Sequence, residues 1–243
     1  MMRVIAWIMA VSAVGFGLFT IVFGIVSPAQ EIHAIHNVVV ASLLIVLSAP
    51  PAIAVARGPD RSIRSLVIIG AVAIASLATM ALSFTVDPFT LPFAILVGVL
   101  WAIMPSRDGA LPACRPSWIM LVLVVAAATP LVLYAFGQAE LQRTDSSSEH
   151  AAFFHWVETS FYAVAIILLA LLPALRPGAF RMAAWMAGTA IAILGAASLL
   201  LGQHASAIDA PWSLAALIGG IVFVAIGEWE SRSRPLSTRQ LAR

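Results

Sequence analysis

Apolar residues occur in long runs along the chain, and short polar segments with Gly, Pro, Ser and charged residues separate the runs. A helix that crosses a bilayer needs about 20 consecutive, mostly apolar residues. Runs of this kind predict eight membrane-spanning helices, near residues 4–26, 35–56, 64–85, 89–105, 117–137, 153–174, 182–202 and 210–228. The fourth is short and its start contains Pro88 and Pro92, so a tilted or re-entrant segment is the alternative there.

The composition agrees with this pattern. Of the 243 residues, 62% are hydrophobic and 10% are charged, whereas about a quarter of the residues of a soluble domain are charged. We therefore predict an all-α, polytopic membrane protein embedded in the lipid bilayer. The first apolar run is too long for the apolar region of a signal peptide and lacks a small-x-small cleavage site, so it is interpreted as a retained helix.

The absence of lysine and the single cysteine exclude several kinds of reaction and site. The 13 basic side chains are all arginines, which excludes reactions that need a Schiff-base lysine. The single cysteine, Cys114, excludes an internal disulfide, a Cys-x-x-Cys redox pair and a cysteine-rich zinc site. The sequence also has no phosphate-binding loop, no glycine-rich dinucleotide turn, no Gly-x-Ser-x-Gly and no His-Glu-x-x-His.

The arginines predict the orientation. If the N-terminus is cytoplasmic, the inner segments hold every arginine except Arg143. Cytoplasmic segments of membrane proteins are rich in Lys and Arg. We therefore predict a multi-pass protein of the cell membrane, specifically a cell inner membrane, with both termini in the cytoplasm. On this interpretation the arginines are orientation signals, and no nucleic-acid partner is expected.

The two halves of the sequence resemble each other weakly. A shift of 119 residues places Arg57-Gly58-Pro59 on Arg176-Pro177-Gly178 and His36 on His155. We interpret this as a duplication, with parallel repeats because each unit has an even number of helices. The predicted units are a first four-helix repeat at 1–110, a second at 111–230 and a cytoplasmic tail at 231–243.

All five histidines fall on the predicted outer side. His33 and His36 are three residues apart, so both rings lie on one face of a helix. His155 and Glu158 have the same spacing, and Glu158 lies about one turn inside an apolar segment, where an acid is costly unless it is paired or faces a cavity. His150 is five residues from His155 and would have to bend back from the helix start to join it.

We predict a joint site at this level, with metal ligands from His33, His36, His150, His155 and Glu158. Glu31 is a further donor next to His33. The alternative is a set of interfacial residues satisfied by water, with Glu158 reaching the outer surface. Three or more imidazoles with a carboxylate suit zinc, copper or iron.

Haem is the second candidate cofactor, because His36 and His155 could ligate one iron across the interface between the repeats. This layout is broadly similar to that of duplicated four-helix haem proteins such as haem A synthase. The similarity is limited to architecture: the sequence has no histidine deep in the fourth or eighth predicted helix and no Glu-x-x-His-Arg motif. That family's activity is therefore not transferred.

The functional hypothesis is an integral membrane protein with an outward-facing His/carboxylate site that binds a transition metal or haem. It would be an oxidoreductase-type enzyme or a cofactor-handling factor, so whether it is an enzyme stays open. A small transporter or channel, or a structural assembly subunit, are the alternatives. The sequence does not give the reaction, the small-molecule or metal ligand, the catalytic residues or the oligomeric state.

Overall fold

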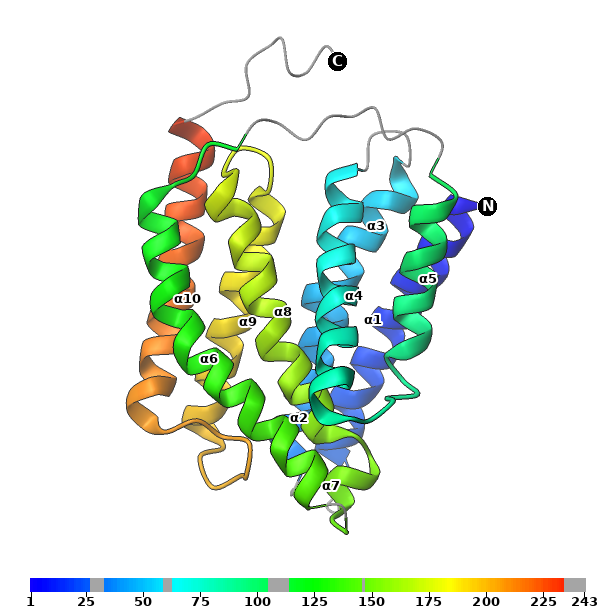
Figure 1. Cartoon of the computed structure of the whole chain (residues 1–243), viewed down its shortest axis with the longest axis vertical. Coiled ribbons are helices and arrows are strands. Elements are labelled where there is room, and N and C mark those ends of the chain that lie inside the picture. Colours follow the sequence, from blue (N-terminus) through cyan, green and yellow to red (C-terminus); the bar gives the residue numbers. More distant parts are fainter. Residues whose placement is uncertain (27–32, 59–62, 105–113, 146, 234–243) are drawn as a thin grey trace.

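The computed structural model describes residues 1–26, 33–58, 63–104, 114–145 and 147–233. All regular secondary structure within these ranges is helical (Figure 1). The elements are α1 (Met2–Val26), α2 (Ala34–Ser42), the π-helical turn η2 (Leu43–Ser48), α3 (Ala49–Arg57), α4 (Ile63–Ser83), α5 (Leu91–Ala102), α6 (Trp118–Thr144), α7 (Glu149–Ala152), α8 (His155–Leu175), α9 (Arg181–Leu200) and α10 (Ala210–Ser233).

Seven helical segments of the described chain are long and apolar enough to cross a membrane. The predicted all-helical architecture is thus confirmed, and the seven segments are consistent with a multi-pass membrane protein. The fourth expected span, at 89–105, is instead the 12-residue helix α5, about 18 Å long against a hydrocarbon core of about 30 Å. The carboxylate of Asp87 accepts from the Phe89 amide at 2.8 Å and the Thr90 hydroxyl at 2.7 Å. These bonds hold a turn that delays the helix until Leu91.

The second span is continuous from Ala34 to Arg57 but changes its hydrogen-bond pattern in the middle. The π-helical turn η2 lies immediately before Pro50 and Pro51, which have no backbone N–H to continue the ladder. Within it the Ser48 hydroxyl donates to the carbonyl of Leu43 at 2.8 Å. The proline pair therefore changes the hydrogen-bond pattern within this helix, and the helix continues beyond it.

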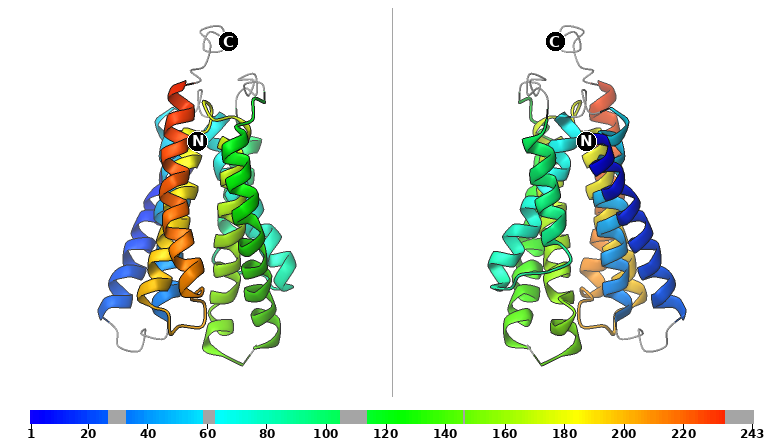
Figure 2. Two further views of the ribbon diagram at one scale, coloured as in Figure 1. Left: turned by 90° about the vertical axis from the view of Figure 1, so that its left-hand side faces the viewer. Right: turned by 90° about the vertical axis from the view of Figure 1, so that its right-hand side faces the viewer.

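The helices form two layers, best seen edge-on in Figure 2. One layer runs α5–α4–α8–α6 and the other runs α1–α2/α3–α9–α10 (Figures 1 and 2). In Figure 1, α1, α3, α4 and α5 lie on one side of the molecule, and α6, α9 and α10 lie on the other. The two sides meet where α4 packs on α8 and where α2 and η2 pack on α9.

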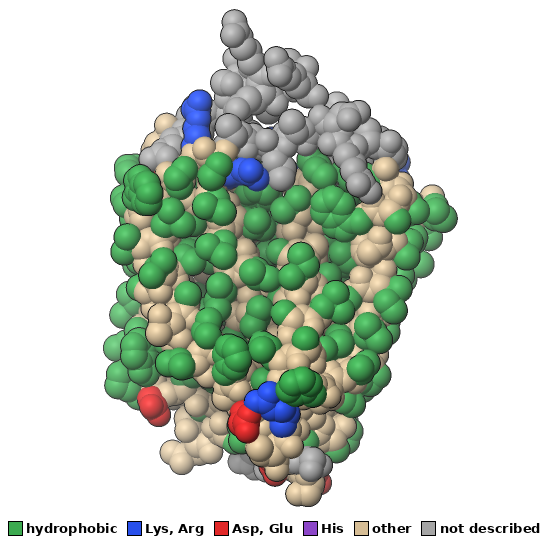
Figure 3. Space-filling view, in the orientation of Figure 1, with side chains coloured by type: hydrophobic (Ala, Val, Ile, Leu, Met, Phe, Trp, Pro, Cys, Tyr) green, Lys and Arg blue, Asp and Glu red, His purple; other side chains and the backbone are tan. Residues whose placement is uncertain are grey.

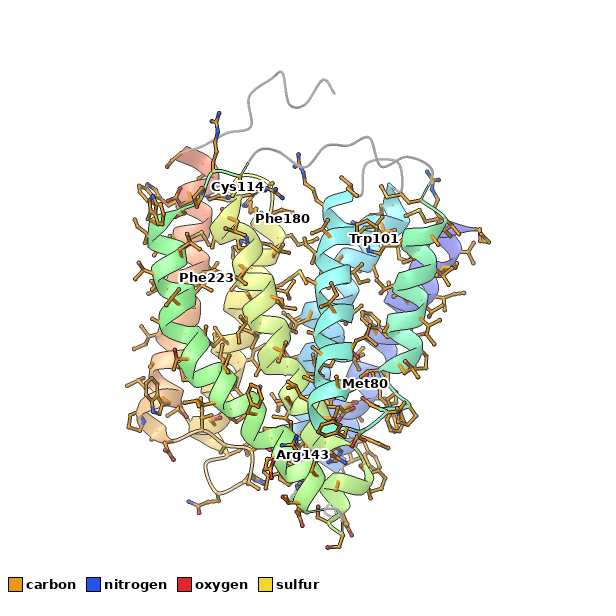
Figure 4. The ribbon with its side chains drawn as sticks, viewed as in Figure 1. Met80, Trp101, Cys114, Arg143, Phe180 and Phe223 are labelled. Atoms are coloured by element: carbon orange, nitrogen blue, oxygen red, sulfur yellow. The ribbon has the colours of Figure 1, made fainter. Side chains whose placement is uncertain are left out.

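The surface has an apolar belt between two charged ends (Figure 3). Apolar side chains that face outward include Val122, Val125 and Leu133 of α6, each about two-thirds exposed. In a bilayer these side chains contact lipid. The first residue of α1 and the end of α10 lie at one end of the bundle, and α7 lies at the other. Arg143, labelled in Figure 4, is at the α7 end.

Candidate functional site: a histidine cluster at the α7 end

Four imidazoles form one cluster at the α7 end of the bundle. The ring centroids of His33 lie 4.6 Å from those of His150 and His155. Those of His36 lie 4.8 and 4.9 Å from the same two rings. The remaining distances are 5.8 Å between His150 and His155 and 6.4 Å between His33 and His36. The cluster thus joins the start of α2 to the α7–α8 region.

A break in the helix brings His150 into the cluster. It lies in α7, and α8 begins only at His155. Between them Phe154 adopts the left-handed conformation, with φ of 62°, which is uncommon for a residue with a bulky side chain. Ser148 caps α7 by accepting from the amide of Ala151 at 3.2 Å. The chain therefore turns back between the two histidines, as their five-residue spacing requires.

Hydroxyl groups fix the tautomer of His36, which is 1% exposed. Its Nδ1 lies 3.0 Å from the Thr159 hydroxyl oxygen, and that hydroxyl donates its only proton to the carbonyl of His155 at 2.7 Å. Thr159 can therefore only accept, so His36 Nδ1 carries the proton and Nε2 carries the lone pair. Nε2 lies 3.3 Å from the hydroxyl of Ser206, whose proton goes to Gln138 Oε1 at 2.9 Å.

His33 is also buried, with 2% exposure, although it lies just before the membrane span. Its Nε2 is 3.6 Å from a carboxylate oxygen of Glu149, whose side chain is 72% exposed. Burial lowers the pKa of His33 below 6.5 and the neighbouring His150 lowers it further, while Glu149 acts in the opposite direction. Glu149 therefore marks the side on which the cluster opens to the exterior of the bundle.

Several polar atoms of the cluster have no hydrogen-bond partner. They are the buried Nδ1 atoms of His33 and His155 and the indole Nε1 of Trp156. Most buried polar atoms in folded proteins are paired, so each exception needs a physical explanation such as an ion or a water molecule. Unpaired nitrogens on two neighbouring imidazoles are donor atoms available to a ligand.

Aromatic rings enclose the cluster. The ring of Trp156 stacks on His150 with centroids 4.8 Å apart and meets His36 edge-on at 5.3 Å. Phe153 stacks against His155 at 5.9 Å. These walls restrict the access of water, which strengthens electrostatic interactions inside the cluster.

The fifth predicted ligand, Glu158, is not part of the cluster. Among the described residues, no hydrogen bond joins the Glu158 carboxylate to an imidazole of the cluster. Glu158 is 8% exposed and within electrostatic range of Asp87, ahead of α5. Glu31 lies outside the described residues, and His204, in the α9–α10 loop, lies within electrostatic range of His36.

The donor atoms of the cluster do not point at a common centre. Among the described residues, no group of three or more His, Cys, Asp and Glu side chains has its donors arranged to hold a metal ion. The spacing of the rings nevertheless matches a metal centre. Imidazoles bound tetrahedrally at about 2.0–2.1 Å place their centroids about 5 Å apart, within the observed range of 4.6 to 6.4 Å. Rotation of the rings about their side-chain bonds would be needed to turn the nitrogens inward.

A haem between His36 and His155 does not fit this geometry. The two rings are stacked face to face, with centroids 4.9 Å apart and planes 15° from parallel. Histidines that ligate a haem iron direct a ring nitrogen at the iron from opposite sides of the macrocycle, whereas these two rings turn their faces to each other. No step is therefore assigned to haem.

Sequence reasoning missed the residues that orient the imidazoles. Thr159 and Ser206 contact His36 from positions 123 and 170 residues away, and Gln138 is a third remote partner. Glu149 was part of the same polar stretch as His150 but was not assigned to the site. Thr159 had one local signal, because it lies four residues after His155 and its hydroxyl can reach that carbonyl.

Comparisons with known proteins add no family to these observations. No family model matches the chain, and searches of curated proteins and of solved structures found no match.

Proposed function

We propose that this protein binds one divalent transition-metal ion through its histidine cluster, on the outward side of the membrane. The observation that carries the proposal is the set of four imidazoles with centroids 4.6 to 6.4 Å apart, two of which have a buried, unpaired Nδ1. Neutral imidazole is the commonest metal ligand among side chains. Zinc is the leading candidate because nitrogen and carboxylate ligands in tetrahedral geometry suit it, and copper and iron follow.

His36 has the features of a metal ligand. Its Nε2 carries a lone pair and lies 3.3 Å from the Ser206 hydroxyl, whose proton is directed to Gln138. Its Nδ1–H donates to Thr159, an arrangement that metal-bound histidines use to fix the ring orientation. Rotation of His33 and His155 would direct their unpaired Nδ1 atoms at the same ion, and Glu149 lies beside His33 as an oxygen donor.

The orientation in the membrane follows from charge. The described loops at the end opposite α7 contain Arg57, Arg115 and Arg176, and cytoplasmic ends are rich in arginine. We therefore place both termini in the cytoplasm and the histidine cluster on the outer side of the cell membrane.

The helix contacts agree with the proposed duplication of the chain. If α1, α2–α3, α4 and α5 correspond to α6, α8, α9 and α10, the contact of α4 with α8 is the counterpart of the contact of α9 with α2 and η2. In this scheme the 12-residue α5 is the shorter counterpart of the 24-residue α10. His36 and His155 occupy corresponding places in this scheme.

Elemental analysis of protein purified in mild detergent without chelators tests the proposal. We expect about one zinc, copper or iron ion per chain, as one tetrahedral site requires. After chelation, the protein should rebind Zn²⁺ or Co²⁺ to saturation. His36→Ala with His155→Ala should abolish binding, whereas Gln203→Ala, a change of an exposed side chain in the α9–α10 loop, should retain it. Absence of both retained metal and saturable rebinding would refute the proposal.

A transport assay separates two roles for a bound ion. Liposomes that contain the wild-type protein should not accumulate Zn²⁺ faster than empty liposomes if the ion is held as a resident ligand. Accumulation that depends on the cluster histidines would instead show that the ion is cargo.

A further inference from the structure

A cavity of about 540 Å³ lies among α6, α8, α9 and α10, away from the histidine cluster. Ligand sites in proteins commonly measure about 300–1,000 Å³. Its walls include Leu131 of α6, Ile166 of α8, Ile191 of α9 and Phe223 of α10. Phe223 is labelled in Figure 4, in the part of the bundle that holds α6 and α10. All four helices are long enough to span a membrane, so the cavity lies at the depth of the lipid chains.

The cavity is apolar along most of its length and polar at one end. Nearly all of its lining residues are aliphatic, and its hydrogen-bonding side chains are those of Tyr134, Asp209 and Trp212. Asp209 and Trp212 lie at the start of α10, in the half of the bundle nearer to the histidine cluster. The Tyr134 hydroxyl donates to the carbonyl of Ser206 at 2.6 Å. The polar end therefore lies at the outer level, and its opposite end extends into the membrane.

The apolar walls of the cavity favour hydrocarbon over water, because they give water no hydrogen-bond partners. At this depth of the membrane the hydrocarbon chains of lipids are the molecules that can reach it. The carboxylate of Asp209 at the polar end repels anionic head groups such as those of fatty acids and acidic phospholipids. A hydroxyl head can instead donate to that carboxylate.

From this we infer that the cavity binds a long-chain lipid with a hydroxyl head group. The chain lies between α6 and α10, and the hydroxyl lies at the outer end beside Asp209 and Tyr134. Ser206 connects this site to the histidine cluster, because its carbonyl accepts from Tyr134 and its hydroxyl contacts His36. The lipid site does not depend on metal binding.

Gly219 offers a direct way to fill the cavity. A Cβ atom added at Gly219 would meet no atom within 4 Å, although the residue lines the cavity. Its neighbour Gly220 packs against α9, where an added Cβ would lie 2.4 Å from the carbonyl oxygen of Gly188. Gly219→Leu therefore projects a side chain into the cavity without disturbing that helix contact. Gly137→Leu on α6 is a matched control, because an added Cβ there also meets nothing and the residue does not line the cavity.

Photo-labelling with a diazirine derivative of an 18-carbon alcohol tests the inference. We expect label on the cavity faces of α6 and α10, removed by excess oleyl alcohol. Because each displaced methylene loses its burial, Gly219→Leu should reduce labelling by roughly tenfold or more, and Gly137→Leu should not. If Gly219→Leu does not purify as a folded protein, Ala128→Leu on the α6 wall replaces it. Labelling spread evenly over the lipid-facing surface, or unchanged by a folded cavity variant, would overturn the inference.

Competition with other lipids tests the head group. Oleyl alcohol should compete with the probe at lower concentration than oleic acid does, and Asp209→Asn should remove that difference. Equal competition by both lipids in the wild-type protein would overturn the assignment of a hydroxyl head. His36→Ala should retain labelling, which separates this site from the metal site.

Discussion

The ring of His36 lies face to face with that of His155, although the two residues are 119 positions apart in the chain. One ring comes from the first turn of α2 and the other from the first residue of α8. Both are neighbours of His33 and His150, so this pair is the centre of the cluster. Any ligand of the cluster therefore contacts both halves of the bundle.

Loss of the Thr159 hydroxyl should weaken metal binding without removing a ligand. Thr159→Val deletes the acceptor that orients His36 through Nδ1–H. Loss of such an outer partner commonly lowers metal affinity by about 10–100-fold. Competition with a chelator of known affinity measures the change, and Thr159→Ser should restore binding. Equal affinity in the wild type and Thr159→Val would show that this hydroxyl does not orient a ligand.

The metal-free protein should lose stability in mild acid. Because burial and His150 lower the pKa of His33 below 6.5, the unfolded chain takes up this proton more readily than the folded protein does. The contribution of His33 to the free energy of unfolding is thus fully present above about pH 6.5, and it is lost as the pH falls below that value.

Unfolding curves between pH 5 and 8, recorded after chelation, measure this dependence. His33→Gln should flatten part of it, because glutamine does not titrate. Superimposable pH profiles for the wild type and the variant would contradict the assignment.

Neighbouring glycines of α10 should respond oppositely to substitution. Gly220→Ala forces a methyl group to within 2.4 Å of the Gly188 carbonyl oxygen and 2.8 Å of the Ala192 amide nitrogen. Overpacking of this kind costs about 1–3 kcal/mol. Gly219→Ala meets nothing and gains helix propensity. Thermal unfolding in detergent should place Gly220→Ala well below the wild type and Gly219→Ala at or above it. Equal losses in both would indicate that the helix contact is not the cause.

Tyr162 should stabilise the junction of three helices. Its hydroxyl donates to the carbonyl of Ala190 in α9 at 2.8 Å and lies 2.7 Å from the hydroxyl of Ser42 in α2. Tyr162→Phe leaves both partners without this bond at a fully buried position, at an expected cost of about 1–2 kcal/mol. Reversible unfolding in mixed micelles measures the loss. Phe161→Leu, a neighbouring change without a hydroxyl, separates hydrogen bonding from packing.

The sequence predicted the spans well where apolar runs were long. The predicted 64–85 and 182–202 differ from α4 and α9 by one or two residues at each end. The predicted fourth span corresponds to the shorter helix α5, which begins only at Leu91 because the Asp87 carboxylate holds Phe89 and Thr90 in a turn. The π-helical turn has no counterpart in the apolar pattern, which is continuous through Leu43–Ser48.

Only those cluster residues whose own side chains suggest metal binding could be predicted from the sequence. Helical spacing linked His33 to His36, and the repeat linked His36 to His155. The inclusion of His150 depends on the left-handed Phe154, a conformation that aromatic residues rarely adopt. The partners Ser206 and Gln138 are ordinary polar residues in sequence. Their role appears only when α6 and the α9–α10 loop pack against α2.

The imidazoles come from two distant parts of the chain, and this affects how a bound ion would stabilise the fold. His33 and His36 precede the α4–α8 contact in the chain, and His150 and His155 follow α6. An ion bound to all four would act as a staple that closes a loop of more than a hundred residues. In a polypeptide severed between α5 and α6, the ion would add to the packing of α4 on α8 and of α2 on α9, and chelation would weaken the association of the two fragments.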